Sequence, residues 1–224
     1  MSENTHIFVL QKKIHDMIKN VVFDFGGVVV DIDRRRAVDA FVRLGLTDAD
    51  TILDKYHQTG IFLELEEGTL SESDYRKRLG EMCKRTLEWE EVRRAWLAFI
   101  TGMDERKLAF FEKLRSKYRL FVLSNTNPYI MSWACSSEFS SGKKPLNDYF
   151  DRLYLSYQIG YTKPDRRIFD YMLRDASLQP AETLFVDDGA ANIEAGRKVG
   201  MHTLLVENGG DWREKVSAAL GEKF

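Results

Sequence analysis

Three short apolar runs of this chain carry, at or near their ends, residues whose side chains can do chemistry. Asp24 lies at the end of the first run, and Ser124 and Asn125 end the second. Asp187 and Asp188 end the third. If these runs are parallel strands, their carboxyl ends meet at one edge of a sheet, where open α/β sheets bind ligands. Carboxylates and a hydroxyl gathered there suit a magnesium ion and a phosphoryl group.

A lysine between the second and third runs could supply a positive charge to the same edge. Lys163 stands in the loop sequence Lys-Pro-Asp, and Asp165 is suited to cap the helix that follows. Taken singly, each of these groups is more typical of a turn or a helix cap than of a reactive site. Only their joint arrangement along the chain favours phosphoryl chemistry.

The runs themselves are typical of strands in a parallel sheet. They are largely continuous in apolar residues rather than alternating, as expected of strands buried on both faces. Four such runs are found, at residues 21–25, 120–123, 183–186 and 202–206. Segments with helical spacing lie between the later runs, and one of them is closed by Gly200. This alternation predicts a doubly wound α/β fold.

Residues 34–101 differ from the rest of the chain, because helical spacing continues through them and no convincing strand interrupts it. We interpret this stretch as a helical domain inserted between the first strand and the remainder of the sheet. The connections are expected to be loops near Asp33 and Gly102.

The inserted stretch also carries a cluster of acidic residues. Glu64, Glu66 and Glu67 are expected to form a solvated surface. Gly68 follows them directly and could instead place this loop over the site at the sheet edge.

The composition excludes several classes of function. The 224 residues are 44% hydrophobic and 30% charged, which fits one large domain or one domain with an insertion. A formal net charge of −2 disfavours general nucleic-acid binding. No apolar run approaches the ~18 residues of a membrane span, so no membrane partner is expected. Cys83 and Cys135 are too few for a zinc cluster and predict free thiols in a cytoplasmic protein.

Taken in order, the four groups resemble the motifs of the haloacid dehalogenase superfamily. The likeness rests on Val-Phe-Asp-Phe-Gly-Gly-Val around Asp24 and Leu-Ser-Asn-Thr at Ser124. It continues with Lys-Pro-Asp at Lys163 and Phe-Val-Asp-Asp-Gly at Asp187. Any one motif is weak, but four in order over nearly the whole chain are a strong signal.

This resemblance implies a domain organisation. Residues 1–16 would be an N-terminal extension, and residues 17–33 and 102–224 a Rossmann-like catalytic core. Residues 34–101 would be the helical cap that the family places between its first and second motifs. The branch most similar includes sugar-1-phosphate phosphatases and the N-terminal phosphatase domain of bifunctional epoxide hydrolases. The implied partner is a small phosphorylated metabolite.

The resemblance also implies a nucleophile and a metal. Asp24 would attack phosphorus to form an aspartyl-phosphate, which water would then hydrolyse. Mg²⁺ would be held by Asp24, the backbone carbonyl of Gly26 and the acidic pair. Within that pair, Asp188 would be the direct ligand, and Asp187 would bind through water or lie behind it.

Three further residues would handle the phosphoryl group. By similarity, the hydroxyl of Ser124 and the backbone of Asn125 would hold a phosphoryl oxygen. Lys163 would offset negative charge on the nucleophile before attack and on the transferring group during it.

The chain departs from the family pattern two residues after the nucleophile. Most phosphatases of the family carry a second Asp there, which protonates the leaving oxygen and then activates water, a contribution of roughly 10²–10⁴-fold. Gly26 occupies that position here. We therefore expect aryl, acyl or sugar-1-phosphates to be better substrates than primary alkyl phosphates. Asp31 is the first candidate for a substitute acid.

Three functions stay open on the sequence alone. The favoured one is a magnesium-dependent phosphatase of a small ester such as a sugar phosphate. A phosphomutase or phosphonate-cleaving hydrolase would share the motifs, although Gly26 disfavours a mutase, which needs acid/base help twice. A phospholigand-binding or regulatory protein with weak activity would also account for the missing acid.

Overall fold

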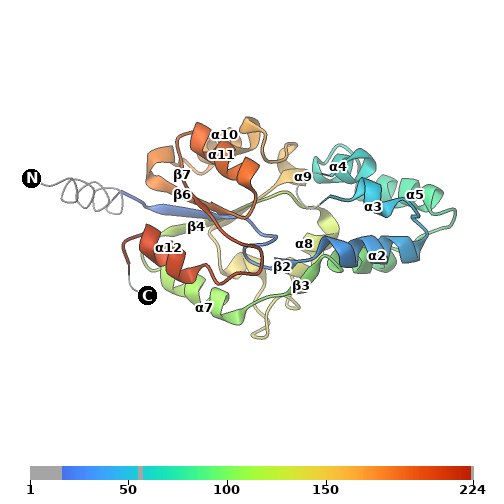
Figure 1. Cartoon of the computed structure of the whole chain (residues 1–224), viewed down its shortest axis with the longest axis horizontal. Coiled ribbons are helices and arrows are strands. Elements are labelled where there is room, and N and C mark those ends of the chain that lie inside the picture. The colour runs from blue at the N-terminus through green and yellow to red at the C-terminus, as the bar shows by residue number, and fades with distance from the viewer. Residues whose placement is uncertain (1–16, 55–57, 223–224) are drawn as a thin grey trace, which may run out of the picture.

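A five-stranded parallel sheet forms the centre of the molecule (Figure 1), in the order β5-β4-β1-β6-β7. The computed structural model describes residues 17–54 and 58–222, so the predicted N-terminal extension at residues 1–16 lies outside the described residues. The strands are β1 (Asn20–Phe23), β4 (Arg119–Ser124), β5 (Arg152–Leu155), β6 (Thr183–Asp187) and β7 (His202–Leu205).

The pairing of the central strands brings the polar strand ends together. β1 lies between β4 and β6 and runs parallel to both. Asp24 follows β1 directly, while Ser124 ends β4 and Asp187 ends β6. The carboxyl ends of three adjacent strands therefore meet at one edge, as the apolar runs predicted.

Helices cover both faces of the sheet. Successive strand side chains point to opposite faces, so Val21 and Phe23 enter one hydrophobic core and Val22 enters another. α7 (Glu105–Leu114) and α12 (Arg213–Ala219) pack on the first face, and α10 (Arg166–Asp175) and α11 (Ala190–Lys198) on the second. Figure 1 shows these two helical layers on either side of the strands. The predicted doubly wound α/β fold is confirmed.

The ends of two helices follow the local signals in the sequence. The carboxylate of Asp165 accepts the backbone N–H of Arg167 and caps the start of α10, close to the loop that carries Lys163. Gly200, with φ of 92°, follows the end of α11 in the left-handed conformation that glycine adopts readily.

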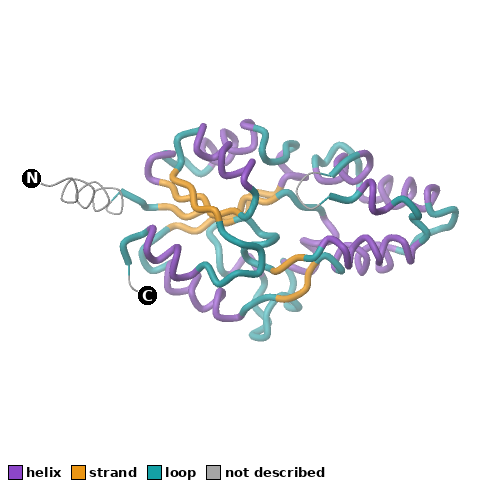
Figure 2. The backbone as a smooth tube through the Cα atoms, viewed as in Figure 1, coloured by secondary structure: helices purple, strands orange, loops and turns teal. Residues whose placement is uncertain are grey.

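Five helices form a separate unit, here called the helical insertion, between the first strand and the rest of the sheet. They are α2 (Arg34–Leu44), α3 (Ala49–Ile52), α4 (Gly60–Glu66), α5 (Glu72–Met82) and α6 (Trp89–Leu97). Figure 2 shows this unit as helices and loops at one end of the molecule. Its core is largely its own, with the rings of Phe41 and Phe62 5.1 Å apart and those of Phe41 and Trp96 5.5 Å apart.

The expectation of plain loops at the two junctions was wrong. β2 (Asp31–Ile32) and β3 (Ile100–Gly102) pair antiparallel and connect the helical insertion to the sheet-containing part. Strands of two or three residues are too short to leave a pattern in the sequence. The two crossings are therefore tied to each other by backbone hydrogen bonds.

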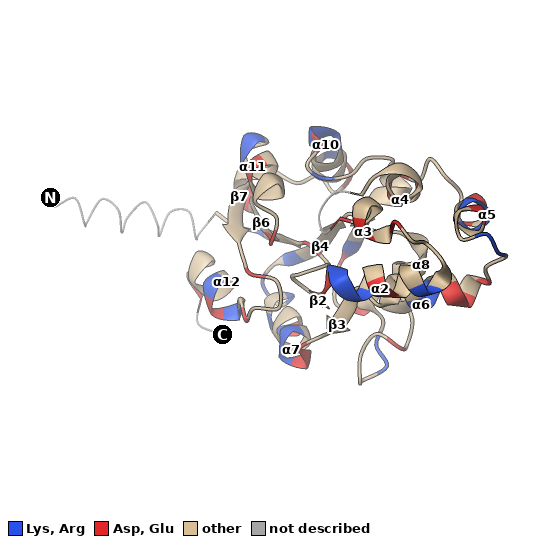
Figure 3. Ribbon diagram, turned by 45° about the vertical axis from the view of Figure 1, so that its right-hand side comes forward, with Lys and Arg blue, Asp and Glu red and all other residues tan. Residues whose placement is uncertain are grey.

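The remaining elements are short. They are α8 (Pro128–Ala134), α9 (Ser156–Ile159) and the 3₁₀ turns η1 (Leu146–Asp148) and η2 (Pro180–Glu182). Among the described helices, none is both long and apolar enough to cross a membrane. Figure 3 shows acidic and basic residues sharing outer helices such as α5 and α7.

Candidate active site

Asp24 is fixed at the carboxyl end of the central strand. Its backbone N–H donates to the carbonyl oxygen of Val186 at 2.9 Å, which extends the pairing of β1 with β6. Its carboxylate oxygen Oδ1 accepts the N–H of Phe25 at 2.7 Å and lies 2.8 Å from the ammonium of Lys163. These contacts hold a largely buried carboxylate in place on the wall of a pocket.

Lys163 is buried between two carboxylates. Its Nζ lies 2.8 Å from Asp24 and 2.7 Å from Asp187, and its side chain is 1% exposed. The Asn125 side chain holds this lysine's backbone from both sides, accepting its N–H at 2.7 Å and donating to its carbonyl at 2.8 Å. Burial lowers the pKa of Lys163, but the two carboxylates outweigh burial and raise its pKa overall. The lysine is therefore a fixed positive charge.

Three carboxylates converge at the sheet edge. Ligand oxygens of Asp24, Asp187 and Asp188 all lie within 4.8 Å of one another. Burial raises the pKa of Asp24; Lys163 counteracts this, whereas the other two carboxylates add to it. Lys163 is the only lysine or arginine among the described residues lining the pocket. A cluster of oxygen ligands with excess negative charge fits a hard divalent cation such as Mg²⁺.

The two neighbouring aspartates have different surroundings. Asp187 is fully buried, and it accepts hydrogen bonds from the backbone N–H of Gly189 at 2.7 Å and from the amide of Asn192 at 3.0 Å, besides its pair with Lys163. Asp188 instead lines the pocket. A Cβ at Gly27, where φ is 83°, would overlap the Asp188 carboxylate, so this close approach requires glycine.

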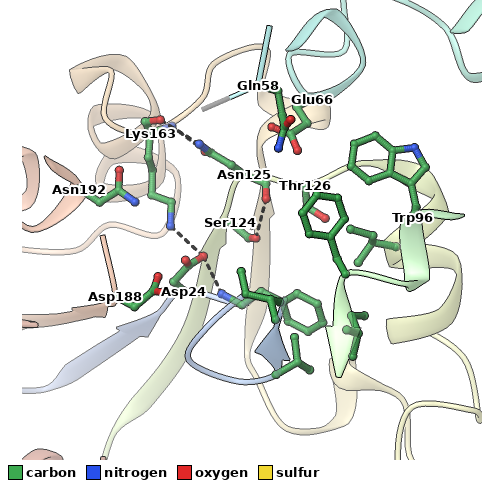
Figure 4. A pocket seen from close by; sticks show the side chains of 17 residues that line it. Asp24, Gln58, Glu66, Trp96, Ser124, Asn125, Thr126, Lys163, Asp188 and Asn192 are labelled. Atoms are coloured by element: carbon green, nitrogen blue, oxygen red, sulfur yellow. Dashed lines mark hydrogen bonds and ion pairs between the residues drawn. The ribbon is translucent and has the colours of Figure 1, made fainter. Parts of the chain in front are cut away.

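Figure 4 shows the pocket into which these groups face. Its lower and left walls carry the polar groups Asp24, Lys163 and Asp188, with Ser124 and Asn125 beside them. The other walls are largely apolar and contain Val30, Ile32, Trp96, Phe99, Ile100 and Ile130. Water is thus partly excluded from around the charged groups, which strengthens their electrostatic effect.

Two neighbouring side chains on the β4 side are buried against the pocket. The hydroxyl of Ser124 donates to the carbonyl of Asn125 at 3.2 Å. Thr126 also lines the pocket, and its hydroxyl has no hydrogen-bond partner among the described residues. A buried polar atom without a partner costs free energy.

The structure brings the predicted site residues together, with one exception among the candidates. Gly26 lines the pocket with the charged groups, and Asp187 lies directly behind them. Asp31, the candidate substitute acid, is not among the described residues that line the pocket. Its carboxylate lies 3.2 Å from the buried ammonium of Lys107 and is part of the junction strand β2.

Sequence reasoning missed residues that reach the pocket from the helical insertion. Gln58, Glu66 and Trp96 line it, as does Asn192 on α11. The side chain of Gln58 is held by its own loop, because its amide makes hydrogen bonds at 3.1 and 2.7 Å to the backbone of Asp54. Asn192 follows Asp187 by five residues in the first turn of α11, a spacing that could have pointed to it.

The prediction of a solvated acidic surface was wrong for Glu66. This residue ends α4, four positions after the buried Phe62, and is only 6% exposed. Burial, together with the negative charges of Asp24 and Glu67, raises its pKa to about 8. The alternative, in which this segment lies at the site, agrees with the structure because Glu66 lines the pocket. Gly68 (φ 67°) packs there against the backbone carbonyl of Tyr157 on α9.

Comparison with known proteins gives a consistent result. A family model of haloacid dehalogenase-like hydrolases matches residues 18–200. The D-ribitol-5-phosphate phosphatase of Bacteroides thetaiotaomicron is 60% identical over 204 residues, covering 91% of this chain and 99% of that protein.

Two solved structures resemble the chain closely. A HAD-like family hydrolase from Porphyromonas gingivalis superposes with a TM-score of 0.88 at 38% identity, over 92% of this chain and 100% of its own. A HAD family enzyme from Bacteroides thetaiotaomicron, solved with magnesium and inorganic phosphate, gives a TM-score of 0.82 at 32% identity, over 88% and 98%.

Proposed function

The chain belongs to the haloacid dehalogenase-like hydrolases, and we propose that within this family it is a magnesium-dependent phosphatase of a sugar or sugar-alcohol phosphate. It is a hydrolase of phosphate monoesters. The observation that carries the proposal is the cluster of three carboxylates around Lys163 at the end of the central strand. Acidic oxygens and a fixed cation at one point are the components that phosphoryl transfer needs.

The enzyme uses Mg²⁺, and the residues present fit that ion. Asp24, Asp188 and the backbone carbonyl of Gly26 would hold it, with Asp187 behind them as the partner of Lys163. When bound, the ion would offset the negative charge that gathers on the phosphoryl group. The support is the oxygen-only ligand set and its excess of negative charge.

The chain's own residues suggest how the phosphoryl group is handled. Asp24 would attack phosphorus through a carboxylate oxygen and form an aspartyl-phosphate. Lys163 would stabilise the charge on the transferring group, because its ammonium already contacts the nucleophile at 2.8 Å. The Ser124 hydroxyl and the Asn125 backbone would donate to a phosphoryl oxygen, from the strand end next to Asp24.

The proposed substrate carries its phosphate on a primary carbon and hydroxyls along its chain. The relative that is 60% identical is by name a phosphatase of D-ribitol-5-phosphate, which is an ester of this kind. Such an ester belongs to the class that Gly26 was expected to disfavour, since its alkoxide leaves poorly without a proton donor.

A phosphate-release screen tests this function. Purified protein would be offered polyol phosphates, sugar-1-phosphates, sugar-6-phosphates and an aryl phosphate, with magnesium and with a chelator. We expect release only with magnesium and the highest kcat/KM with a polyol phosphate. Asp24→Asn should lower release by at least ~10⁴-fold while keeping the fold, because the amide is not a nucleophile. An Asp24→Asn variant as active as the native enzyme would rule the mechanism out.

A further inference from the structure

A phosphatase that acts on alkyl esters needs a group that protonates the leaving oxygen. In this chain the position two residues after the nucleophile, where the family usually has that group, is a glycine. Gly26 has no side chain to offer. Asp31, the next acidic residue after Gly26 along the chain, is paired with Lys107 at 3.2 Å and does not line the pocket. The donor must therefore come from another element.

Few side chains in the pocket could exchange a proton. Among the described residues that line it, the acidic and basic ones are Asp24, Glu66, Lys163 and Asp188. The proposed function assigns Asp24 as nucleophile, Asp188 to the metal and Lys163 to charge stabilisation. Glu66 is the one left without a role. It is also the only one of the four that the helical insertion provides.

The position of Glu66 suits a leaving group. In phosphoryl transfer the attacking and leaving oxygens are roughly in line through phosphorus, so the leaving oxygen lies on the side away from the nucleophile. Figure 4 shows Asp24 on the lower wall of the pocket and Glu66 on the upper wall, with Ser124 and Asn125 between them. A substrate whose phosphorus sits at Asp24 therefore extends its leaving oxygen toward Glu66.

We propose that Glu66 is the general acid and base of the reaction and replaces the side chain missing at Gly26. This inference rests on the proposed phosphatase function. In the first step, the Glu66 carboxyl gives its proton to the leaving oxygen as the bond from phosphorus to that oxygen breaks. In the second step, the Glu66 carboxylate takes a proton from the water that attacks phosphorus. The bond from phosphorus to Asp24 then breaks, and phosphate leaves.

The surroundings of Glu66 hold it in the protonated form that the first step requires. Its pKa is raised to about 8 by burial and by the charges of Asp24 and Glu67, so the carboxyl keeps its proton at neutral pH. The other titratable group that senses it is the buried phenol of Tyr75. The second step returns a proton from the attacking water to Glu66, so the carboxyl is protonated again for the next turnover.

Backbone packing fixes the end of α4 at the pocket. Gly68, two residues after Glu66, adopts φ of 67° and approaches the Tyr157 carbonyl so closely that a Cβ would overlap it. Phe62, one turn before Glu66, is fully buried in the core of the helical insertion. The backbone that carries Glu66 is thus anchored on both sides, which restricts where its side chain can lie.

The test compares Glu66→Gln with Glu67→Gln, which makes the same replacement of a carboxyl by an amide at a neighbouring position outside the pocket. Rapid-quench measurements would give the rate of the first step for a polyol phosphate and for 4-nitrophenyl phosphate, each with magnesium. Glu66→Gln should slow the first step with the polyol ester about 10²–10⁴-fold. With the aryl ester, whose phenolate leaves without protonation, the first step should change less than about threefold.

The second step provides an independent readout. Because Glu66→Gln also lacks the base for water attack, the aryl ester should show a burst of one phenolate per enzyme and then slow turnover. Glu67→Gln keeps the Glu66 carboxyl, so it should retain both steps, although loss of the Glu67 charge lowers the pKa of Glu66. Equal slowing of the first step with both esters, or no slowing with either, would overturn the proposal. A native protein that releases phosphate from no ester would instead refute the proposed function.

A second variant tests whether the lost function is proton transfer. A Cβ at Gly26 would lie 3.5 Å from Ile32, an ordinary contact, and the backbone there is not in the left-handed region. Asp at this position is therefore compatible with the fold. In the Glu66→Gln background, Gly26→Asp should recover at least tenfold in the polyol rate and leave the aryl first step unchanged. A double variant that folds and keeps the aryl burst without such recovery would count against the proposal.

Discussion

At the sheet edge, reactive side chains are fixed by the backbone of adjacent strands, whereas those of the helical insertion reach the pocket through tertiary packing. Asp24 and Ser124 follow or end paired strands, so their places are set by strand register. Glu66 is placed by the burial of α4 and by the contact of Gly68 with α9. On the proposed mechanism, the sheet edge would transfer the phosphoryl group and the helical insertion would provide the proton.

Within the sheet edge, substitutions of Asp188 and Asp187 should separate metal binding from structure, with larger effects than the glycine substitutions in the helical insertion. Asp188→Ala should lower phosphate release roughly 10²–10³-fold at limiting magnesium, with partial recovery at high magnesium. Asp187→Ala leaves Lys163 with one carboxylate fewer at 2.7 Å, so it should cost about 3–5 kcal/mol of stability. Magnesium titrations and melting curves of both variants distinguish these roles, and identical magnesium dependence in the two would contradict them.

In the helical insertion, the matched pair Gly68→Ala and Gly60→Ala isolates the contact that positions Glu66. Both glycines have positive φ, 67° and 55°, so each substitution costs about 1–2 kcal/mol in backbone strain. A Cβ at Gly68 would also overlap the Tyr157 carbonyl, whereas one at Gly60 meets nothing within 4 Å. Gly68→Ala alone should lower polyol phosphate turnover, by roughly 10–100-fold. Equal activities of the two variants, measured as kcat, would show that the contact does not position the acid.

The smallest effect expected is on stability against pH. The folded-state pKa of Glu66, about 8, lies above the ordinary 4.5, so the native fold loses stability as pH rises between these values. Glu66→Gln removes that loss. In metal-free protein, its melting temperature should exceed the native value by roughly 3–10 °C at pH 8.5 and match it near pH 4.5. Glu67→Gln is the control, and a difference that does not grow with pH would contradict the burial of Glu66.

The sequence predicted the sheet edge far better than the helical insertion, for a physical reason. An apolar run that ends in polar residues indicates both a strand and the position of its carboxyl end. The sequence therefore predicted that Asp24, Ser124 and Asp187 lie together at one edge of the sheet. The short strands β2 and β5 left too little pattern, and β5 begins with a charged residue at the edge of the sheet. Glu66 carries no local sign of burial, because Gly68 and Tyr157 meet only in the folded chain.

The most direct test of the separate roles of the sheet edge and the helical insertion is an acid quench of Glu66→Gln during turnover of an aryl phosphate. If the sheet edge transfers the phosphoryl group and Glu66 activates the water, the covalent intermediate should accumulate to nearly one per enzyme. Mass spectrometry should then locate the phosphoryl group on Asp24 by peptide fragmentation. Rapid phenolate release with no phosphorylated Asp24, or the same low level of intermediate as in the native enzyme, would contradict the account.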